Sequence, residues 1–374
     1  MRHLATIRKI SDIYPISGKD RVEMAVVDGW TCMVSKSDNF KIGDYCIFCE
    51  TDSVFPATEQ WEFLSRYKYR IKTQRYKDGN GVHFFSQGLV LPLSVLKDNI
   101  GNKLVPLEVG TDVTDIFGIT QYEPEIDYDK GDYAVKTKRR YPKWLMRWAW
   151  FRKLVQPKAM DLEFPSFISK TDEERIQNLP GIIHEPEVWT ATEKVDGQSG
   201  TFVLLRHRGL FGSRYDFMVC SRNKRKPFND GSSYWCVAER YDINKRLKAV
   251  LKANQRWKWI ALQGECIAPN VQKNKYRVKE PDLYVFNVIT PEQGRWGSLD
   301  AASFVEHELQ MKFVPIVYKA LEFHKDMQVP DVLEFSNGKS KIGNTVREGL
   351  VFRSADGKKS FKAVSPEFCI KYGI

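Results

Sequence analysis

The stretch Val188-Trp189-Thr190-Ala191-Thr192-Glu193-Lys194-Val195-Asp196-Gly197 runs from an apolar, strand-like segment into a short charged turn. A lysine amine is a good nucleophile only when it is deprotonated, so a site that uses it must lower its pKa or supply a base or a metal ion. Here carboxylates flank Lys194, and their charge favours the protonated amine. A bound metal ion that neutralises Asp196 is therefore the natural requirement for chemistry at Lys194.

A single Lys-x-Asp-Gly is a weak signal and is more often a solvated turn, but here it is one of a series. Five more motifs follow it: Ser221-Arg222-Asn223, Gln263-Gly264-Glu265, Leu283-Tyr284-Val285-Phe286-Asn287-Val288, Arg347-Glu348-Gly349-Leu350-Val351-Phe352 and Ser360-Phe361-Lys362-Ala363-Val364. In their order and spacing these motifs resemble those of the superfamily of ATP-dependent ligases and mRNA capping enzymes. We therefore expect a covalent nucleotidyltransferase.

The resemblance implies which residues perform the chemistry. Lys194 is expected to attack the α-phosphate of ATP and to carry the AMP. Asp196, Glu265 and Glu348 match the acidic positions that hold a divalent metal ion, directly or through its waters, and Mg²⁺ prefers such oxygen ligands. Each of the three could instead be a solvated carboxylate at a strand end. Lys362 matches a lysine that balances the negative charge building on the α-phosphate.

The same resemblance indicates residues that bind the nucleotide. Phe286 matches the aromatic residue that stacks on adenine, a contact worth about 1–3 kcal/mol, although a buried strand also favours a core aromatic there. Arg222 matches a residue that contacts ribose or phosphate, and Asn223, the next residue, is expected to help bind the nucleotide through its amide. Glu193, directly before the nucleophile, is included in the nucleotide site. Arg175 is expected to contact the nucleotide as well, and a surface role fits its position equally.

The last motif departs from the family pattern, which commonly carries Lys-x-Lys. Ser360 occupies the position of the first lysine, and Lys358 and Lys359 come just before it. The sequence leaves open which second lysine, if any of these, reaches the phosphate.

Turn signals alternate with short β-rich runs from Val22 to Pro56, which indicates a small barrel or sandwich. Strand-like pieces at 88–93 and 112–116 fit the same compact module. We predict an α+β fold in two parts, an OB-like β-barrel domain followed by an α+β nucleotidyltransferase domain of the ligase type (ATP-grasp-like) with antiparallel sheets. The predicted boundaries are 1–120 for the OB-like domain, 121–163 for a linker and 164–374 for the adenylyltransferase domain.

The linker contains a basic, Trp-rich segment at 144–155 that indicates an amphipathic helix. Its tryptophans could pack against either domain, or the helix could face nucleic acid or a membrane. In the second domain strand-like and helical patterns alternate. Strands are expected at 188–192, 201–205, 217–220, 259–265, 283–289, 349–353 and 360–364, and helices at 170–178, 232–251 and 301–312.

Composition is that of a globular protein. The hydrophobic and charged fractions, 42% and 28%, exclude wholesale disorder. The 58 basic residues exceed the 47 acidic ones by 11, which suits a polyanionic partner such as nucleic acid. Seven cysteines, an odd count with no secretory signal before them, indicate reduced thiols in the cytoplasm. No run reaches the roughly 18 apolar residues of a membrane span.

The domain order resembles that of RNA ligases of the Deinococcus and Naegleria type, in which an OB module precedes the catalytic core. Only 12 residues follow Lys362, too few for the OB domain that follows the core in capping enzymes and DNA ligases. The resemblance implies an ATP-dependent RNA ligase that seals 3′-OH/5′-phosphate nicks in duplex RNA or RNA/DNA, with RNA on the 3′-OH side. The intermediates would be lysyl-AMP and a 5′-adenylylated end.

The expected cofactors are ATP, as AMP donor, and Mg²⁺ or Mn²⁺. The expected partner is nucleic acid, and we expect a monomer. Two rival functions come from other classes, a capping-type guanylyltransferase that uses GTP and a non-catalytic nucleic-acid-binding protein with a decayed core. The presence of Lys194, Glu265, Glu348 and Lys362 argues against decay.

Overall fold

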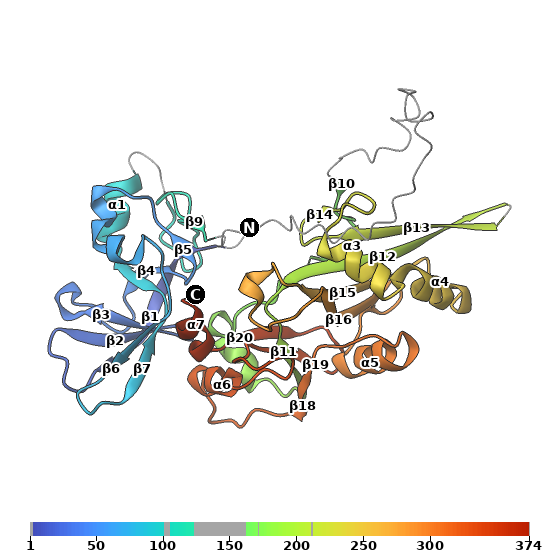
Figure 1. Ribbon diagram of the computed structural model, residues 1–374. Helices are drawn as coiled ribbons and strands as arrows, with labels where there is room; N and C mark the ends of the chain where they lie inside the picture. The colour runs from blue at the N-terminus through green and yellow to red at the C-terminus, as the bar shows by residue number, and fades with distance from the viewer. Residues whose placement is uncertain (1–2, 101–104, 123–161, 171, 211, 374) are drawn as a thin grey trace.

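The computed structural model describes residues 3–100, 105–122, 162–170, 172–210 and 212–373. These residues form an N-terminal β domain and a C-terminal α+β domain, and helix α7 (Pro366–Tyr372) lies where the two meet (Figure 1). The sheets of both domains are antiparallel, which confirms the predicted fold class. Residues 123–161, which contain most of the predicted linker and its basic helix at 144–155, lie outside the described residues.

The N-terminal domain is built on one five-stranded sheet. Its strand order is β3 (Trp30–Ser35), β2 (Val22–Val27), β1 (Ala5–Pro15), β4 (Tyr45–Cys49) and β8 (Leu89–Pro92). Strand β1 pairs with β4 through residues 5–9 and with β2 through residues 10–15, and its register shifts between Ile10 and Asp12. Because one strand serves both halves of the sheet, the sheet curls into part of a barrel. The strands predicted between Val22 and Pro56 are confirmed.

Smaller elements complete this domain. They are the strand pairs β5 (Ser53–Val54) with β9 (Thr120–Gln121) and β6 (Gln74–Lys77) with β7 (His83–Ser86), the 3₁₀ helices η1 (Lys36–Asp38) and η2 (Glu59–Tyr67), and helix α1 (Ser94–Ile100). The strand predicted at 112–116 is wrong. Asp112 accepts hydrogen bonds from the backbone N–H and the hydroxyl of Thr114, and this local bonding closes a turn instead.

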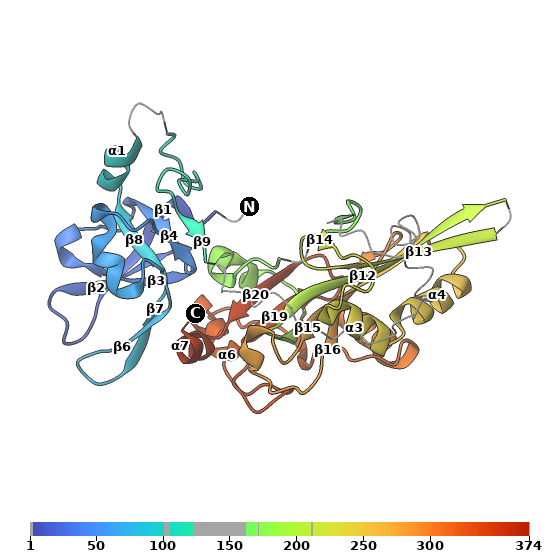
Figure 2. The same cartoon turned by 45° about the horizontal axis from the view of Figure 1, so that its top comes forward.

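The C-terminal domain contains two antiparallel sheets. The larger has the order β10 (Leu162–Glu163), β14 (Lys224–Arg225), β13 (Gly212–Cys220), β12 (Gln198–Gly209), β15 (Trp259–Ile267), β16 (Asp282–Thr290) and β17 (Gly294–Arg295). The smaller has the order β18 (Ile316–Leu321), β11 (Trp189–Lys194), β19 (Gly349–Ser354) and β20 (Ser360–Val364). The β12–β13 hairpin projects away from the N-terminal domain in both orientations (Figures 1 and 2). Each predicted strand of this domain overlaps an observed one.

Helices cover the larger sheet, but two predicted helices have different limits. The predicted helix 232–251 is two helices, α3 (Ser233–Arg240) and α4 (Ile243–Ala253), because Asp242 takes a left-handed conformation with φ of 47°. The predicted helix 301–312 is α5 (Ser298–Ser303) followed by one π-helical turn, η7 (Phe304–Glu308). Both groups bury apolar side chains, such as Leu247 and Val305, in one core with β12, β15 and β16.

The smaller sheet has its own core. Helix α6 (Val329–Ser336) and the 3₁₀ helices η4 (Ile176–Asn178) and η5 (Pro180–His184) supply Val332, Ile176 and Ile183 to it. These side chains pack with Trp189 and Phe361, which are fully buried. Strands β11 and β20, which carry Lys194 and Lys362, are therefore held by a packed core rather than by flexible loops.

The helix predicted at 170–178 is wrong except at its last three residues, which form the 3₁₀ helix η4. The described residues between 172 and 175 are not helical, and Arg175 is extended, with φ of −75° and ψ of 141°. The reason is a bridge to β20: the backbone N–H of Lys362 donates to the carbonyl oxygen of Glu174 at 2.7 Å. The Glu174 carboxylate also accepts the N–H of Arg175. These bonds replace those that a helix would make, so no N-cap forms at Asp172.

Asn178 joins the two domains. Its side-chain oxygen accepts hydrogen bonds from Arg8 at 2.9 Å and from the Trp30 indole at 2.7 Å. Its amide nitrogen donates to Glu50 at 2.8 Å, and the backbone N–H of Gly29 donates to the neighbouring Gln177 carbonyl. Side chains and main chain of both domains thus meet in one hydrogen-bonded network, which fixes their relative placement.

Two further predictions from composition can be compared with the structure. All seven cysteines are free thiols, as predicted. Burial raises the pKa of the Cys46 thiol to about 12, against the opposing charge of Arg8, so this thiol is inert rather than reactive. In the described parts of the chain, no helix has the length and apolarity needed to cross a bilayer.

Candidate active site

Lys194 is the last residue of strand β11, and the strand pairing sets its neighbours. It lies opposite Gly349, the first residue of β19, so that Glu348 comes immediately before its pairing partner. The Lys194 Nζ is 2.6 Å from Glu348 Oε1. A side chain at position 349 would collide with the backbone of Ala363 and Val364 on β20, so glycine is required for the close approach of the three strands.

The turn after Lys194 brings in two more carboxylates. The backbone N–H of Gly197 donates to Glu265 Oε1 at 3.2 Å, and the N–H of Asp196 donates to the Tyr276 hydroxyl at 2.8 Å. A Cβ at position 197 would lie 2.5 Å from the carbonyl oxygen of Cys266, so only glycine lets this turn pass so close to β15. The sequence Lys-x-Asp-Gly therefore has a structural reason: its glycine places Asp196 and Glu265 beside Lys194.

Burial and crowding shift the charges of this cluster. Burial raises the pKa of Glu265 to about 8, although the charge of Lys194 opposes it. Burial and the Glu348 charge also raise the pKa of Asp196 to about 6, against the opposing effect of Lys275. For Lys194 burial favours the neutral amine, but the charges of Glu348, Glu265 and Asp196 outweigh it and raise the pKa. Without a further cation the amine is therefore protonated.

Lys362 approaches from β20. Its Nζ donates to Asp172 Oδ1 at 3.1 Å, and the other oxygen of Asp172 accepts from Arg222 at 2.7 Å. Burial lowers the pKa of Lys362 to about 8, with Asp172 opposing and the cations Arg175 and Lys194 adding to the effect. Asp172 thus bridges Lys362 and Arg222, and the cations Arg175 and Lys194 lie close to them, as a site for a polyanion requires.

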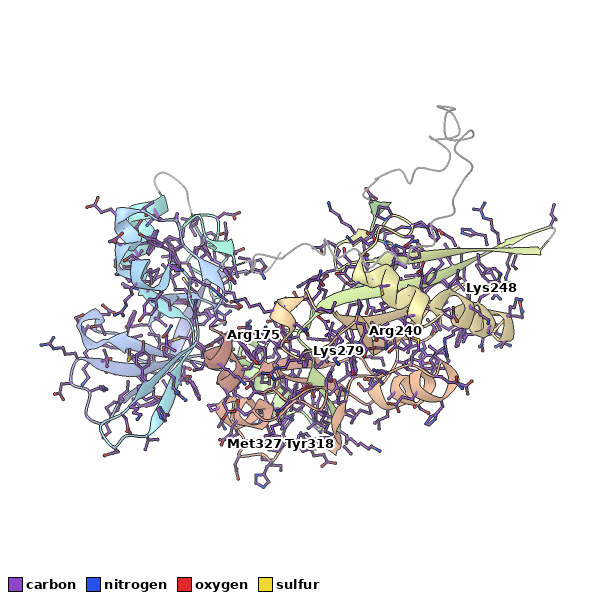
Figure 3. All side chains as sticks on the ribbon, viewed as in Figure 1. Arg175, Arg240, Lys248, Lys279, Tyr318 and Met327 are labelled. Carbon is purple, nitrogen blue, oxygen red and sulfur yellow. The ribbon has the colours of Figure 1, made fainter. Side chains whose placement is uncertain are left out.

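A cavity of about 160 Å³ opens at this cluster, between the two domains. The C-terminal domain contributes Asp172, Arg175, Lys194, Arg222, Glu348, Lys362, Val364, Phe368 and Cys369, and the N-terminal domain contributes Thr51, Asp52, Thr73 and Gln121. Arg175 lies at the junction (Figure 3). Its Nη2 is 3.5 Å from Asp52 of the N-terminal domain, so this arginine belongs both to the cavity and to the domain interface.

Five predicted site residues do not line the cavity: Asp196 and Glu265, which lie beside Lys194, and Glu193, Phe286 and Asn223. The carboxylate of Glu193 points to the other face of β11, where it accepts hydrogen bonds from the Ser340 hydroxyl and the Lys341 backbone N–H. The Phe286 ring is half-buried and packs against the core of the larger sheet. Asn223 accepts a hydrogen bond from Lys170 at 3.4 Å and lies in the exposed turn between β13 and β14.

The structure also places the candidate second lysines of the last motif. Lys359 Nζ pairs with Glu185 and Glu187, both at 2.6 Å, and Lys358 pairs with Asp356 and is largely exposed. Ser360, at the position of the first family lysine, donates its hydroxyl hydrogen to Glu173. Of the lysines in this motif, Lys362 is therefore the one that lines the cavity.

Two residues near the cluster carry no motif signal in the sequence. Lys275, in the loop before β16, forms an ion pair with Asp196, and its side chain is only 8% exposed. Asp172 holds Lys362 and Arg222 in place, but its segment was predicted to be a helix. A loop residue that acts through a partner far along the chain produces no periodic pattern, so sequence reasoning missed Lys275. The hydrogen bonds from Lys362 and Arg222 to Asp172 could not be predicted either, because they depend on how residues 172–175 fold.

The carboxylate cluster fits a divalent cation. Its donors are oxygens, its three carboxylates outnumber the nearby amines of Lys194 and Lys275, and the buried Glu348 Oε2 has no hydrogen-bond partner among the described residues. The described His, Cys, Asp and Glu side chains contain no group of three or more that could by itself hold one metal ion. Nucleotide phosphates and water would have to complete the coordination, which is the usual arrangement for Mg²⁺ at phosphoryl-transfer sites.

Two family models match the chain. One is described as an OB-fold domain and matches residues 4–93, and the other is described as RNA ligase and matches residues 187–372. Among solved structures, Naegleria gruberi RNA ligase with PPi shares 30% sequence identity at a TM-score of 0.77, and the match covers 100% of this chain and 99% of that chain. The chain belongs to the RNA ligase family. None of the curated proteins compared with it matches significantly.

Two further structures of that enzyme show the same relation. A mutant with ATP and Mn has a TM-score of 0.77 at 30% identity, with coverage of 100% of both chains. Another mutant, with AMP and Mn, has a TM-score of 0.76 at 30% identity, with coverage of 99% of both chains. These matches extend over nearly the whole of both chains, and the predicted family, with its N-terminal OB module, is confirmed.

Proposed function

We propose that this chain is an ATP-dependent RNA ligase that seals 3′-OH/5′-phosphate nicks in duplexes, with RNA on the 3′-OH side. Membership of the RNA ligase family supports it, and so do relatives of the same fold solved with ATP and Mn or AMP and Mn. One observation carries the proposal most: the Lys194 amine sits 2.6 Å from Glu348 at the wall of a cavity that Lys362 and Arg222 also line.

In the first step the Lys194 nitrogen forms a bond to the α-phosphorus of ATP, and the bond from that phosphorus to the pyrophosphate oxygen breaks. The amine must first lose its proton, and Glu348 is close enough to accept it. Burial of Lys194 already favours the neutral amine. A divalent cation held by Asp196, Glu265 and Glu348 would offset the carboxylate charge that opposes this and would stabilise charge on the phosphate.

The cations of the cavity take the phosphates. Lys362 is placed to balance the charge that develops on the α-phosphate, and Arg222 and Arg175 lie along the same wall for the remaining phosphates or the ribose. We propose that Phe286 stacks on adenine with the exposed part of its half-buried ring. Asn223 would lie near the sugar. Glu193 acts indirectly, because its hydrogen bonds to Ser340 and Lys341 fix the strand that ends in Lys194.

In the second step the AMP moves from Lys194 to the 5′-phosphate of the broken strand. In the third, the 3′-OH attacks that phosphate and AMP leaves. The same cations serve each transfer, because each builds negative charge on a phosphate in the same place. The N-terminal OB domain would hold the duplex through phosphates and 2′-hydroxyls. We further propose that the protein works as a monomer inside the cell.

The test is sealing of nicked duplex RNA under three conditions. Wild type should seal a 5′-phosphate nick with ATP and not with GTP. Lys194→Ala should fail on the 5′-phosphate but seal a nick whose 5′ end is already adenylylated, because the third step needs no lysine nucleophile. Lys359→Ala is the matched control, since this lysine pairs with Glu185 and Glu187 away from the cavity. Sealing by Lys194→Ala with ATP, or a preference for GTP, would contradict the proposal.

A further inference from the structure

Helix α4 and the loop after it carry an unusual concentration of positive charge. From Ile243 to Lys258 there are six basic residues and no acidic one. On the helix, Lys245, Lys248 and Lys252 follow one another at spacings of three and four residues, so they share one face, and all three are exposed. Figure 3 shows Lys248 in the part of the C-terminal domain far from the N-terminal domain. This face does not belong to the candidate active site.

The β12–β13 hairpin is fixed to the same surface. Arg206, which is buried, donates to the main-chain carbonyls of Leu251 and Gln255, each at 2.6 Å. The exposed Arg208 donates to the Gln255 carbonyl as well. Lys248 lies over the ring of Tyr215 on β13 at 5.0 Å. These contacts join the hairpin and α4 into one rigid platform, with Arg208 beside the lysines of the helix.

Carboxylates of the described residues do not balance the charge of this platform. None of Arg208, Lys245, Lys248, Lys252, Arg256 and Lys258 forms an ion pair with a carboxylate in the described parts of the chain. Like charges three and four residues apart on a helix repel one another and destabilise it. Such an arrangement suits a surface that binds a polyanion, because the polyanion supplies the opposite charges and the release of its own counterions favours binding.

We propose that these six residues form a second nucleic-acid contact, the basic platform, which binds the phosphates of the duplex about one helical turn from the break. The inference rests on the proposed ligase function. Strand β12 gives the distance: it begins at Gln198, directly after the active-site turn, and runs 12 residues to Gly209. At about 3.3 Å per residue this is roughly 40 Å, which is of the same order as one turn of a B-form DNA duplex, about 34–36 Å.

The platform would act through charge rather than through base recognition. Exposed lysine and arginine side chains contact phosphates, and such contacts position a duplex without reading its sequence. Binding through the platform should therefore depend on salt and on duplex length, and not on the sequence of the flanks. A duplex too short to reach from the break to α4 should gain nothing from it.

The test compares Lys248→Gln/Lys252→Gln/Lys258→Gln with Lys319→Gln/Lys325→Gln/Lys339→Gln. The second set removes the same charge from exposed lysines on and around the smaller sheet. Affinity for nicked duplex RNA is measured at 50 and 200 mM salt, with flanks of about 6 or about 20 base pairs on each side. Three lost phosphate contacts reduce the salt slope by about 2.7, so wild type should lose about 40-fold more affinity than the platform variant over this range.

The outcomes separate this inference from the proposed function. We expect the platform variant to bind the long duplex more weakly than wild type and the control variant, to bind the short duplex equally, and to form lysyl-AMP at the wild-type rate. Equal binding of the long duplex by all three proteins would overturn the platform. A loss that is equal on the short and the long duplex would also overturn it. Failure of wild type itself to form lysyl-AMP would instead refute the ligase proposal.

Discussion

Replacement of Glu265 by glutamine should make the protein more stable and less active at once. Glu265 shares a buried corner with Asp196 and Glu348, and the amines of Lys194 and Lys275 cannot balance all three carboxylates. Glutamine keeps the shape and can still accept the hydrogen bond from the Gly197 N–H, but it carries no charge. The substitution therefore removes repulsion that the ligand-free protein must bear.

The magnitude follows from the pKa of Glu265, which burial raises from 4.5 to about 8. At pH 7 the unfolded chain ionises this group and the folded protein keeps it mostly protonated. Each pH unit above 4.5 then costs about 1.4 kcal/mol of folding free energy, or about 3 kcal/mol at pH 7. Part of the Glu265 side chain reaches solvent, which reduces the effect. We expect Glu265→Gln to stabilise the protein by about 1–3 kcal/mol.

The size of the stabilisation by Glu265→Gln depends on pH in a defined way. Because the folded pKa lies above the unfolded one, the difference between Glu265→Gln and wild type should vanish below about pH 4.5, grow with pH and level off above about pH 8. Urea unfolding at pH 5, 6, 7 and 8 measures it, with Glu306→Gln, an exposed glutamate on η7, as the control. Equal stability of variant and wild type at pH 8 would refute the reasoning, as would a difference that stays constant with pH.

Three more predictions concern the surroundings of the cluster. Lys275→Met leaves Asp196 without its buried partner and should destabilise the protein by about 3 kcal/mol in urea unfolding, whereas Lys273→Met, two residues away and exposed, should change little. Asn178→Ala removes the hydrogen bonds to Arg8 and Trp30 and should expose the domain junction to limited proteolysis; an unchanged digestion pattern would argue against a fixed interface. Lys362→Met should slow lysyl-AMP formation about a hundredfold. Burial lowers the pKa of Lys362 to about 8, so below pH 8 the folded protein bears the cost of this buried charge and Lys362→Met should be more stable than wild type. This cost is lost as pH rises towards 10.5, so the difference in stability should shrink between pH 8 and 10.

The core of the site could be predicted from the sequence because its residues lie at strand ends. Lys194 ends β11, Glu265 lies in β15, and Glu348 directly precedes β19, so short motifs next to apolar runs identified them. The fold class followed from the same alternation of strands and turns. Predictions of this kind succeed where local pattern and tertiary role coincide.

The predictions that were wrong or incomplete have two physical causes, contacts distant in sequence and local bonding or backbone conformation that no periodic pattern reports. The segment 172–175 has helical sequence signals, but Lys362 on β20 takes the backbone acceptor that the helix would use. The long helix predicted at 232–251 breaks at Asp242, whose left-handed backbone no periodicity reports. The turn at 112–116 forms because Thr114 bonds to Asp112. Lys275 reaches Asp196 from a loop 79 residues away in sequence, which only the folded chain shows.

The most direct measurement is the site of AMP attachment. The protein is incubated with α-labelled ATP and Mg²⁺ or Mn²⁺, resolved by denaturing electrophoresis and digested for mass spectrometry. The account predicts one labelled band, an AMP adduct on the peptide that contains Lys194, and no label on Lys194→Ala. Label that persists on Lys194→Ala, or an adduct on any other lysine, would contradict it.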